Sequence, residues 1–235
     1  MEVSGSRVDV GRVLREAFET YRRFAGPLLG GALVVLGIAG VISEILEASG
    51  GIALALLGLI VYIAAGVLYT GYVVKLVQDS RDGKMHHSVE ELYESAVPYV
   101  GKLILNGLLA AIAIGIGFVL LIVPGLILIT IWAVVAPAIV IENVGPTEAF
   151  GRSRELVRGH GWPVFGAIVL AYLGVLIISF VSAGIGDAIG GDAGHIILGT
   201  IGDILAAPIL ALVASMLFFD LGGGQARAPA EPAAA

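Results

Sequence analysis

The chain has 235 residues, of which 58% are hydrophobic and only 14% charged, and its formal net charge is −6. Soluble proteins average about 45–50% apolar and about 25% charged residues, so this composition excludes an ordinary soluble domain, and it gives no support to nucleic-acid binding. The absence of cysteine excludes disulfides, thiolate metal ligands and cysteine nucleophiles.

The N-terminal segment predicts a short amphipathic helix before the first apolar span. An apolar stripe beside arginines favours a helix that lies in the membrane interface, although a solvated linker helix fits the same residues. The span that follows is long enough to remain as a transmembrane helix, so we expect no cleavable signal peptide. From about Asp9, the apolar residues recur at steps of three and four, at Val10, Val13, Leu14, Ala17, Phe18 and Tyr21.

Six apolar spans are expected in chain order. The clearest tract, Leu103–Ile141, has thirty-nine residues without a charged side chain. One helix of that length, at about 1.5 Å per residue, would be nearly twice as long as a hydrocarbon core of about 30 Å requires. We therefore place a break at Val123-Pro124-Gly125, because proline removes a helical hydrogen bond and glycine permits a reversal. The six spans are Ala25–Ile42, Ile52–Val74, Leu103–Val123, Gly125–Ile141, Pro163–Ser182 and Ile204–Phe219.

The basic residues fall on one side of this pattern. All thirteen Lys and Arg residues precede the first span, lie between spans two and three or four and five, or follow the sixth. The other three connections hold none, but they carry Glu44, Glu47, Asp187, Asp192 and Asp203. Because short loops rich in Lys and Arg stay on the cytoplasmic side, the pattern predicts a multi-pass protein of the cell membrane with both termini cytoplasmic.

Two further cytoplasmic helices precede the third and fifth spans. Ser88-Val-Glu-Glu91 has the pattern of a capping box, in which a serine and a glutamate satisfy the free N–H groups of a helix start. A third short helix is expected after Gly145-Pro146, where apolar residues again recur at helical spacing.

Each cytoplasmic helix runs into a Pro-x-x-Gly elbow that opens a span, at Pro27, Pro98 and Pro163. The fold class predicted is therefore an all-α membrane protein, with six transmembrane helices as three hairpins, each preceded by a cytoplasmic amphipathic helix. Chance is the alternative, since four-residue matches are common in a chain with 34 glycines. The expected organisation is one domain, 1–220, with approximate repeats 9–74, 88–141 and 146–220, and a disordered tail 221–235.

Three segments carry a resemblance to a known family: Gly71–Gly83, Val123–Pro137, and Glu148–Gly159 with Trp162. Here the chain resembles the prokaryotic family named for the membrane domain of glycerophosphoryl diester phosphodiesterase, and related multi-pass proteins. The resemblance covers about Asp9 to Asp220. In fused members the hydrolysis belongs to a separate soluble barrel domain, for which this chain has no room and no matching motif. The resemblance therefore implies a stand-alone membrane part without an established activity.

The densest group of candidate functional residues is Arg152, Arg154, Arg158 and Trp162. Guanidinium groups at the cytoplasmic interface can pair bidentately with lipid phosphates, and an interfacial tryptophan fixes the depth of the next span. The alternative is that these residues only signal topology from a solvated helix face.

Asp203 is the one acidic residue near the end of a strongly apolar stretch, with Gly199, Gly202 and Pro208 around it. A carboxylate within a membrane is costly, so it is a candidate ion or proton site. The simpler hypothesis, which we prefer, places Asp203 at the outer interface as the N-cap of the sixth helix.

His86 and His87 lie near Asp79 and Asp82, but neighbouring residues rarely converge on one ion. We therefore expect no metal site and no cofactor.

No set of acid, base and nucleophile is evident, which argues against an enzyme. The leading hypothesis is a non-enzymatic integral membrane protein, a scaffold or accessory factor of the cell envelope that contacts membrane lipids. Its partners would be lipids, other membrane proteins or a second copy of the chain. The alternative is a transporter or flippase for a small or lipidic solute, which would need a polar cavity inside the bundle.

Overall fold

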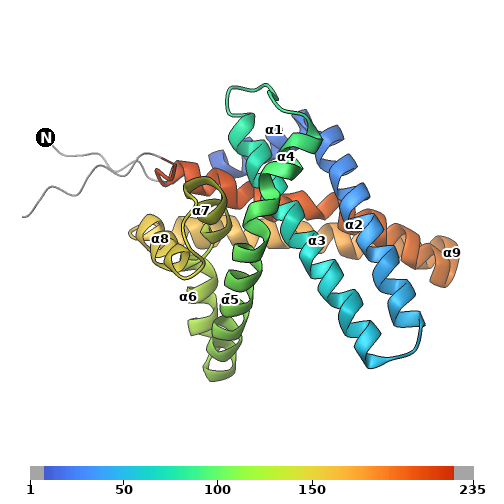
Figure 1. Ribbon diagram of the computed structural model, residues 1–235. Coiled ribbons are helices and arrows are strands. Elements are labelled where there is room, and N and C mark those ends of the chain that lie inside the picture. The colour runs from blue at the N-terminus through green and yellow to red at the C-terminus, as the bar shows by residue number, and fades with distance from the viewer. Residues whose placement is uncertain (1–7, 225–235) are drawn as a thin grey trace, which may run out of the picture.

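The computed structural model describes residues 8–224, including every side chain except those of residues 190–197. Within these residues the chain forms helices and no strand (Figure 1). The elements are α1 (Val10–Arg23), α2 (Ala25–Ala48), α3 (Ile52–Asp79), α4 (Val89–Ala96), the 3₁₀ turn η1 (Val97–Tyr99), α5 (Val100–Leu120), α6 (Ile122–Ile131), α7 (Val135–Glu142), α8 (Glu148–Val157) and α9 (Gly161–Asp220).

The prediction of an all-α protein with six membrane-length helices is confirmed. Each helical span has 21 to 32 residues. At about 1.5 Å per residue, the shortest is long enough for a hydrocarbon core of about 30 Å. The spans are Ala25–Ala48, Ile52–Asp79, Val89–Leu120, Ile122–Glu142, Gly161–Ile189 and Leu198–Asp220.

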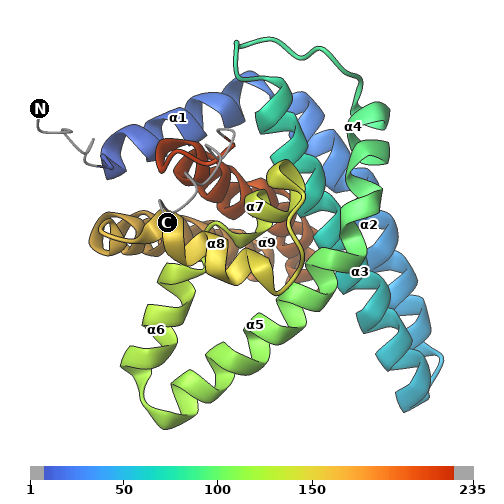
Figure 2. The ribbon, with the colours of Figure 1, turned by 60° about the vertical axis from the view of Figure 1, so that its left-hand side comes forward.

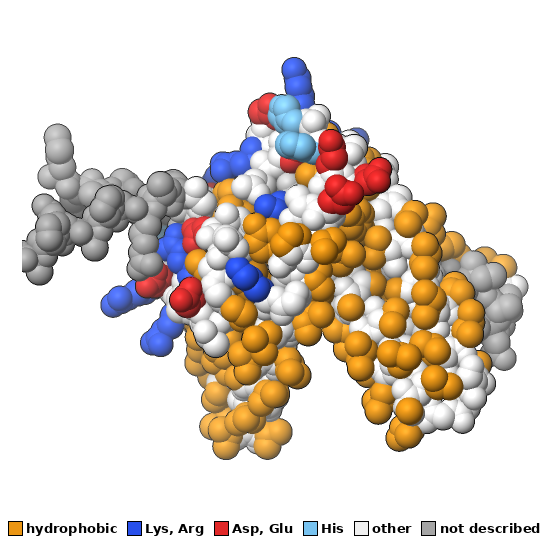
Figure 3. All heavy atoms as spheres, viewed as in Figure 1, with side chains coloured by type: hydrophobic (Ala, Val, Ile, Leu, Met, Phe, Trp, Pro, Cys, Tyr) orange, Lys and Arg blue, Asp and Glu red, His pale blue; other side chains and the backbone are white. Residues whose placement is uncertain are grey.

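The helices diverge in pairs from one end of the molecule. Figures 1 and 2 show α2 beside α3, and α5 beside α6, with the two pairs pointing apart. Lys, Arg, Asp, Glu and His side chains gather where the pairs converge, over α1, α4, α8 and the loop after α3, while the lower ends of α3 and α5 are hydrophobic in the same view (Figure 3). We call the first region the charged end and the diverging ends the tips.

The core lies at the charged end. Tyr72, Leu76, Leu28 and Phe218 are fully buried there, whereas Ile52 and Val119 near the tips are 83% and 88% exposed. Hydroxyl groups tie α3 to the elbow at the start of α2, because Tyr69 donates to Leu28 O at 3.0 Å and Tyr72 to Pro27 O at 2.9 Å.

The last two spans belong to one long helical element that folds back on itself. A methyl group added to Gly202 would lie 2.5 Å from Ser182 Oγ, although twenty residues of straight helix would separate them by about 30 Å. From the sequence we expected a loop at 182–194 between two shorter spans, whereas this segment is part of α9.

Two boundaries in the long apolar tract differ from the prediction. The reversal falls at Leu121, whose backbone is extended, and Pro124 lies in the first turn of α6, where its missing N–H costs nothing. The expected fourth span, Gly125–Ile141, is interrupted between α6 and α7 at residues 132–134. Pro137 explains the interruption, because a proline cannot donate a hydrogen bond to the residue four positions earlier, Ala133, and its ring clashes with that carbonyl.

Ser153 of α8 bridges this interruption. Its hydroxyl donates to Ile131 O at 2.8 Å and accepts from the Val134 N–H at 3.3 Å. Ser153 is fully buried, so it supplies partners for two backbone groups that the broken helix leaves unpaired.

The predicted capping box at the start of α4 is confirmed, since Ser88 Oγ accepts from Glu91 N at 3.2 Å and Glu91 accepts from Ser88 N at 2.7 Å. The predicted tail begins at Leu221, and its first residues, 221–224, form a turn in which the Gly224 N–H donates to Glu142 at 3.0 Å. Residues 225–235 lie outside the described part of the chain.

Candidate functional site

The structure separates Arg152 from the other residues of the predicted lipid-binding group. Its guanidinium forms a bidentate ion pair with Glu142, at 2.6 Å and 2.8 Å, and lies 3.6 Å from Glu155. Hydrogen bonding to Glu142 raises the pKa of Arg152. Since Glu142 ends α7 and also accepts from Gly224, this arginine joins α8 to the broken fourth span and to the C-terminal turn.

Arg154, Arg158 and Trp162 remain available to external groups. All three side chains are exposed, and Trp162 is 84% exposed with its ring 6.1 Å from that of Phe165, edge to face. They follow one another along the end of α8 and the start of α9, at the boundary between charged and apolar sequence. We call them the arginine–tryptophan surface.

Asp203 is not an N-cap. The helix already runs through it from Leu198, so the N–H groups of Ala206 and its neighbours are bonded within the helix. Its side chain is exposed and close enough to Tyr62 of α3 for an electrostatic interaction. Neither of the two cavities described below includes Asp203.

The loop between α3 and α4 brings two histidines onto carboxylates. His87 Nδ1 lies 2.5 Å from Asp79 Oδ1, and His86 Nε2 lies 3.1 Å from Asp82 Oδ2. Hydrogen bonding to Asp79 and its negative charge raise the pKa of His87. Within the described residues no group of three His, Asp or Glu side chains is arranged to hold a metal ion.

A cavity of about 400 Å³ lies beside Asp79 and His87. It is also lined by Lys75, Gln78, Glu91, Leu92 and Ser95.

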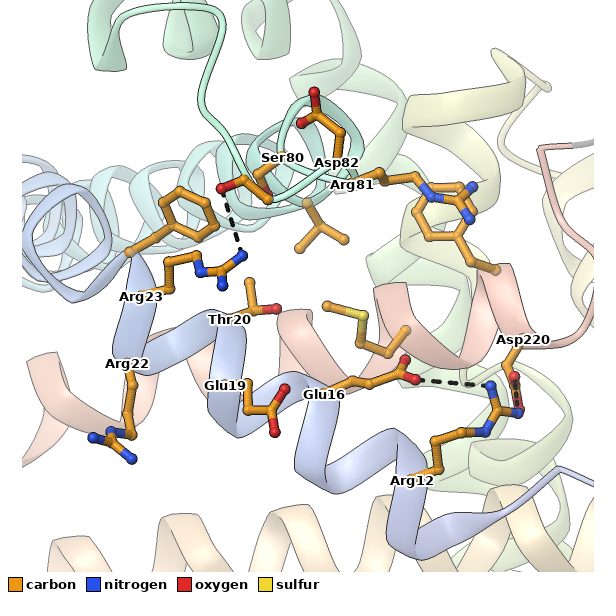
Figure 4. A pocket seen from close by; sticks show the side chains of 15 residues that line it. Arg12, Glu16, Glu19, Thr20, Arg22, Arg23, Ser80, Arg81, Asp82 and Asp220 are labelled. Carbon is orange, nitrogen blue, oxygen red and sulfur yellow. Dashed lines mark hydrogen bonds and ion pairs between the residues drawn. The ribbon is translucent and has the colours of Figure 1, made fainter.

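A polar cleft of about 970 Å³ lies at the charged end, between α1, the end of α3 and the end of α9 (Figure 4). We call it the charged cleft. Its floor includes Phe24, Val77, Met216 and Phe219, and its charged lining consists of four arginines and four carboxylates: Arg12, Arg22, Arg23, Arg81, Glu16, Glu19, Asp82 and Asp220.

Internal contacts close the two ends of the charged cleft. At one end, Arg12 forms a short ion pair with Asp220 and lies 3.8 Å from Glu16. At the other, Arg23 donates to Gly83 O over 3.5 Å. Between them, the Arg81 guanidinium stacks 4.1 Å above the Phe219 ring.

The charged cleft could not be predicted from the sequence, because its walls come from three distant segments. The local signal was a row of charged residues on α1 at helical spacing, Arg12, Glu16, Glu19 and Arg23, which lie on one face of that helix. Figure 4 shows Arg12, Glu16, Glu19 and Arg23 along the side of α1 that borders the cleft, with Arg81 opposite.

Chemically, the arrangement offers groups that bind charged ligands and lipids. Guanidinium groups bind oxyanions, carboxylates bind ammonium groups, and the exposed tryptophan suits a membrane interface. No protein-family model, curated protein or solved structure matches this chain.

Proposed function

We propose that the chain is a non-enzymatic integral membrane protein, a scaffold or accessory factor of the cell envelope that contacts membrane lipids through the arginine–tryptophan surface. The observation that carries the proposal is the exposure of Arg154, Arg158 and Trp162 at the margin of the apolar spans. Basic groups near an anionic surface contribute about 1 kcal/mol each, and tryptophan prefers the same depth.

The proposal includes a cell-membrane topology with both termini cytoplasmic and three hairpins in one direction. It is supported by the side on which Lys and Arg fall in the sequence, and by their gathering over the charged end in Figure 3. The cytoplasmic amphipathic helices would be α1, α4 and α8, each with one buried and one exposed face. This organisation agrees with the resemblance to a stand-alone membrane domain.

A scaffold role is favoured by how the polar groups of the described spans are used. The Thr130 and Ser215 hydroxyls donate to carbonyls four residues earlier in their own helices, and Asn106 of α5 donates to Pro146 O at 2.6 Å. These polar side chains are paired within the protein. Partners that fit the exposed surface are lipids, other membrane proteins and a second copy of the chain.

Lipid retention tests the proposal. We expect Arg154→Gln/Arg158→Gln to reduce the anionic lipid that co-purifies with the protein, while insertion is unchanged. Arg152 is left intact because of its ion pair with Glu142. The control is Arg15→Gln/Lys84→Gln, which removes the same charge from exposed positions on α1 and the α3–α4 loop. Equal lipid retention in the double variant and the unaltered protein would sink the proposal.

Topology is tested separately on the cysteine-free chain. Single cysteines near Asp187 should label from outside intact cells, and those near Gly83 and Glu155 should not. Labelling in the opposite sense would reject the orientation.

A second candidate function is transport of a small or lipidic solute. Figure 3 shows an open notch between the α5–α6 and α2–α3 pairs, and Asp203 is an exposed carboxylate five residues inside the sixth span. In a coupled transporter, Asp203→Asn would abolish flux into proteoliposomes but leave the fold intact. If the unaltered protein shows no flux, the transport function is rejected and the scaffold proposal remains.

A further inference from the structure

The charged cleft contains basic and acidic groups that are not fully paired with one another. Four arginines and four carboxylates line it, yet its ion pairs within the described residues are those of Arg12 with Glu16 and Asp220, and of Asp82 with His86 of the adjacent loop. If these side chains only balanced one another's charge, they would form ion pairs across so small a space. The side chains with unused hydrogen-bonding groups, which we call the spare groups, therefore point to a ligand.

The spare negative groups lie on the wall next to α9 and along α1. Asp220 pairs with Arg12 through Oδ1, but Oδ2 is buried and has no hydrogen-bond partner among the described residues. Only 12% of the Asp220 side chain is exposed, so this oxygen is costly to leave unpaired. Glu19 projects toward the opening, and in the described part of the chain its carboxylate forms no ion pair (Figure 4). Both groups can accept hydrogen bonds from an ammonium ion.

The spare positive groups are Arg81 and Arg23. Arg81 rests on Phe219 without a carboxylate partner in the described residues, and the one hydrogen bond from Arg23 is long at 3.5 Å. A guanidinium carries five N–H donors, so each of these arginines keeps several for an oxyanion. Figure 4 shows the Arg23 guanidinium near Thr20 and Arg81 further along the cleft.

We propose that the charged cleft binds a zwitterion that carries a primary ammonium and an oxyanion, with the chemistry of a phosphoethanolamine group. Arg81 binds the oxyanion, and Glu19, on the α1 side of the cleft, accepts from the ammonium, while Arg23 and Asp220 stand at the two ends of the cleft. A ligand of a single sign would satisfy one set and leave the other without a counter-charge. The apolar floor, formed by Phe24, Val77, Met216 and Phe219, suits the carbon atoms between the two charges.

This inference goes beyond the proposed lipid-contact function, because it involves a different surface and none of Arg154, Arg158 or Trp162. The same chemistry has two sources, a phosphatidylethanolamine headgroup from the bilayer and a free phosphoethanolamine from the cytoplasm or medium. The experiment distinguishes them.

Calorimetric titration of the full chain in phosphatidylcholine nanodiscs with phosphoethanolamine tests the site, because phosphatidylcholine has no ammonium N–H. Ethanolamine alone and inorganic phosphate alone should bind at least tenfold more weakly than phosphoethanolamine, given roughly 1.5–3 kcal/mol for each charged hydrogen bond. Arg81→Gln and Glu19→Gln should each weaken phosphoethanolamine by roughly tenfold for the same reason. Arg15→Gln and Glu90→Gln, at exposed positions outside the cleft, should leave binding unchanged.

Nanodiscs that contain phosphatidylethanolamine identify the source. Loss of phosphoethanolamine binding in them shows that the cleft takes the lipid headgroup, and unchanged binding shows that it takes the free solute. Phosphate that binds as tightly as phosphoethanolamine, or Glu19→Gln without effect, overturns the zwitterion site. So does the absence of binding in both phosphoethanolamine titrations and in native mass spectra with phosphatidylethanolamine. Lipid retention through Arg154 and Arg158 is measured on separate variants, so the two proposals fail independently.

Discussion

The two halves of α3 are both rich in apolar residues but have opposite surroundings. Toward the charged end, Tyr72, Val73, Val74 and Leu76 are completely buried, whereas at the tip Ile52 is 83% exposed and its neighbours are exposed as well. Hydropathy therefore does not determine which half is packed. In a bilayer the tip is solvated by lipid chains that are as apolar as leucine, so the burial at the charged end stabilises the fold by close packing and hydrogen bonds.

Phenylalanine truncation in α9 gives the largest expected difference between the two regions. Phe218 is fully buried at the charged end, and Phe180 is 77% exposed toward the tip. We expect Phe218→Ala to lower the free energy of unfolding by about 3–5 kcal/mol, because it leaves a cavity. Phe180→Ala should change it by less than about 0.5 kcal/mol. Denaturant titration in detergent measures both. Equal losses would show that the tip is packed in the membrane.

Removal of a serine hydroxyl tests the hydrogen bonds of the same two regions. Ser153→Ala leaves Val134 N–H and Ile131 O without partners in a buried site, so we expect a loss of about 1–3 kcal/mol. Ser49 also donates to a carbonyl, Ile45 O at 2.7 Å, but it is exposed near a tip. Ser49→Ala should cost less than about 0.5 kcal/mol. A neutral Ser153→Ala would mean that the break in the fourth span satisfies itself.

Two glycines of α2 allow a finer comparison within one helix. A methyl group on Gly31 would lie 2.9 Å from Tyr93 Oη and 3.2 Å from the Tyr72 ring, whereas Gly40 has open space around it. We expect Gly31→Ala to destabilise by about 1 kcal/mol through overpacking, and Gly40→Ala to stabilise by up to about 1 kcal/mol through helix propensity. Thermal unfolding of both variants should therefore shift in opposite directions. Shifts of the same sign would contradict the packing around Gly31.

The smallest expected effect is electrostatic and concerns His87. Because the contact with Asp79 raises its pKa, the folded state binds this proton more tightly than the unfolded chain. The contribution to stability is complete below the unfolded pKa, about 6.5, and is lost as pH rises through the folded pKa. An NMR titration should place the midpoint of His87 above about 6.5, and Asp79→Asn should bring it down. If the midpoint of His87 is unchanged in Asp79→Asn, Asp79 is not the cause of the raised pKa.

The spans and the capping box could be predicted because both are local. Uninterrupted apolar sequence defines a membrane-length helix whatever surrounds it, and Ser88 and Glu91 satisfy each other within one turn. Pro137 did carry a local signal for the broken fourth span, but its effect was masked by the strongly apolar residues on both sides.

The charged groups could not be assigned from local sequence. Arg152 pairs with a carboxylate ten positions away, and the charged cleft joins residues more than two hundred positions apart, as in Arg12 with Asp220. Whether an arginine faces lipid, a ligand or an internal carboxylate depends on how the helices pack, which periodicity does not determine.

The Ser153 bridge also sets an order of events during synthesis. Ile131 and Val134 emerge from the ribosome before Ser153, so the fourth span enters the bilayer with two backbone groups unpaired. Within hydrocarbon such groups cost several kcal/mol, and water at the insertion machinery can satisfy them for a time. The fourth span becomes complete only when α8 docks onto it. Maturation of this part of the protein therefore waits for α8.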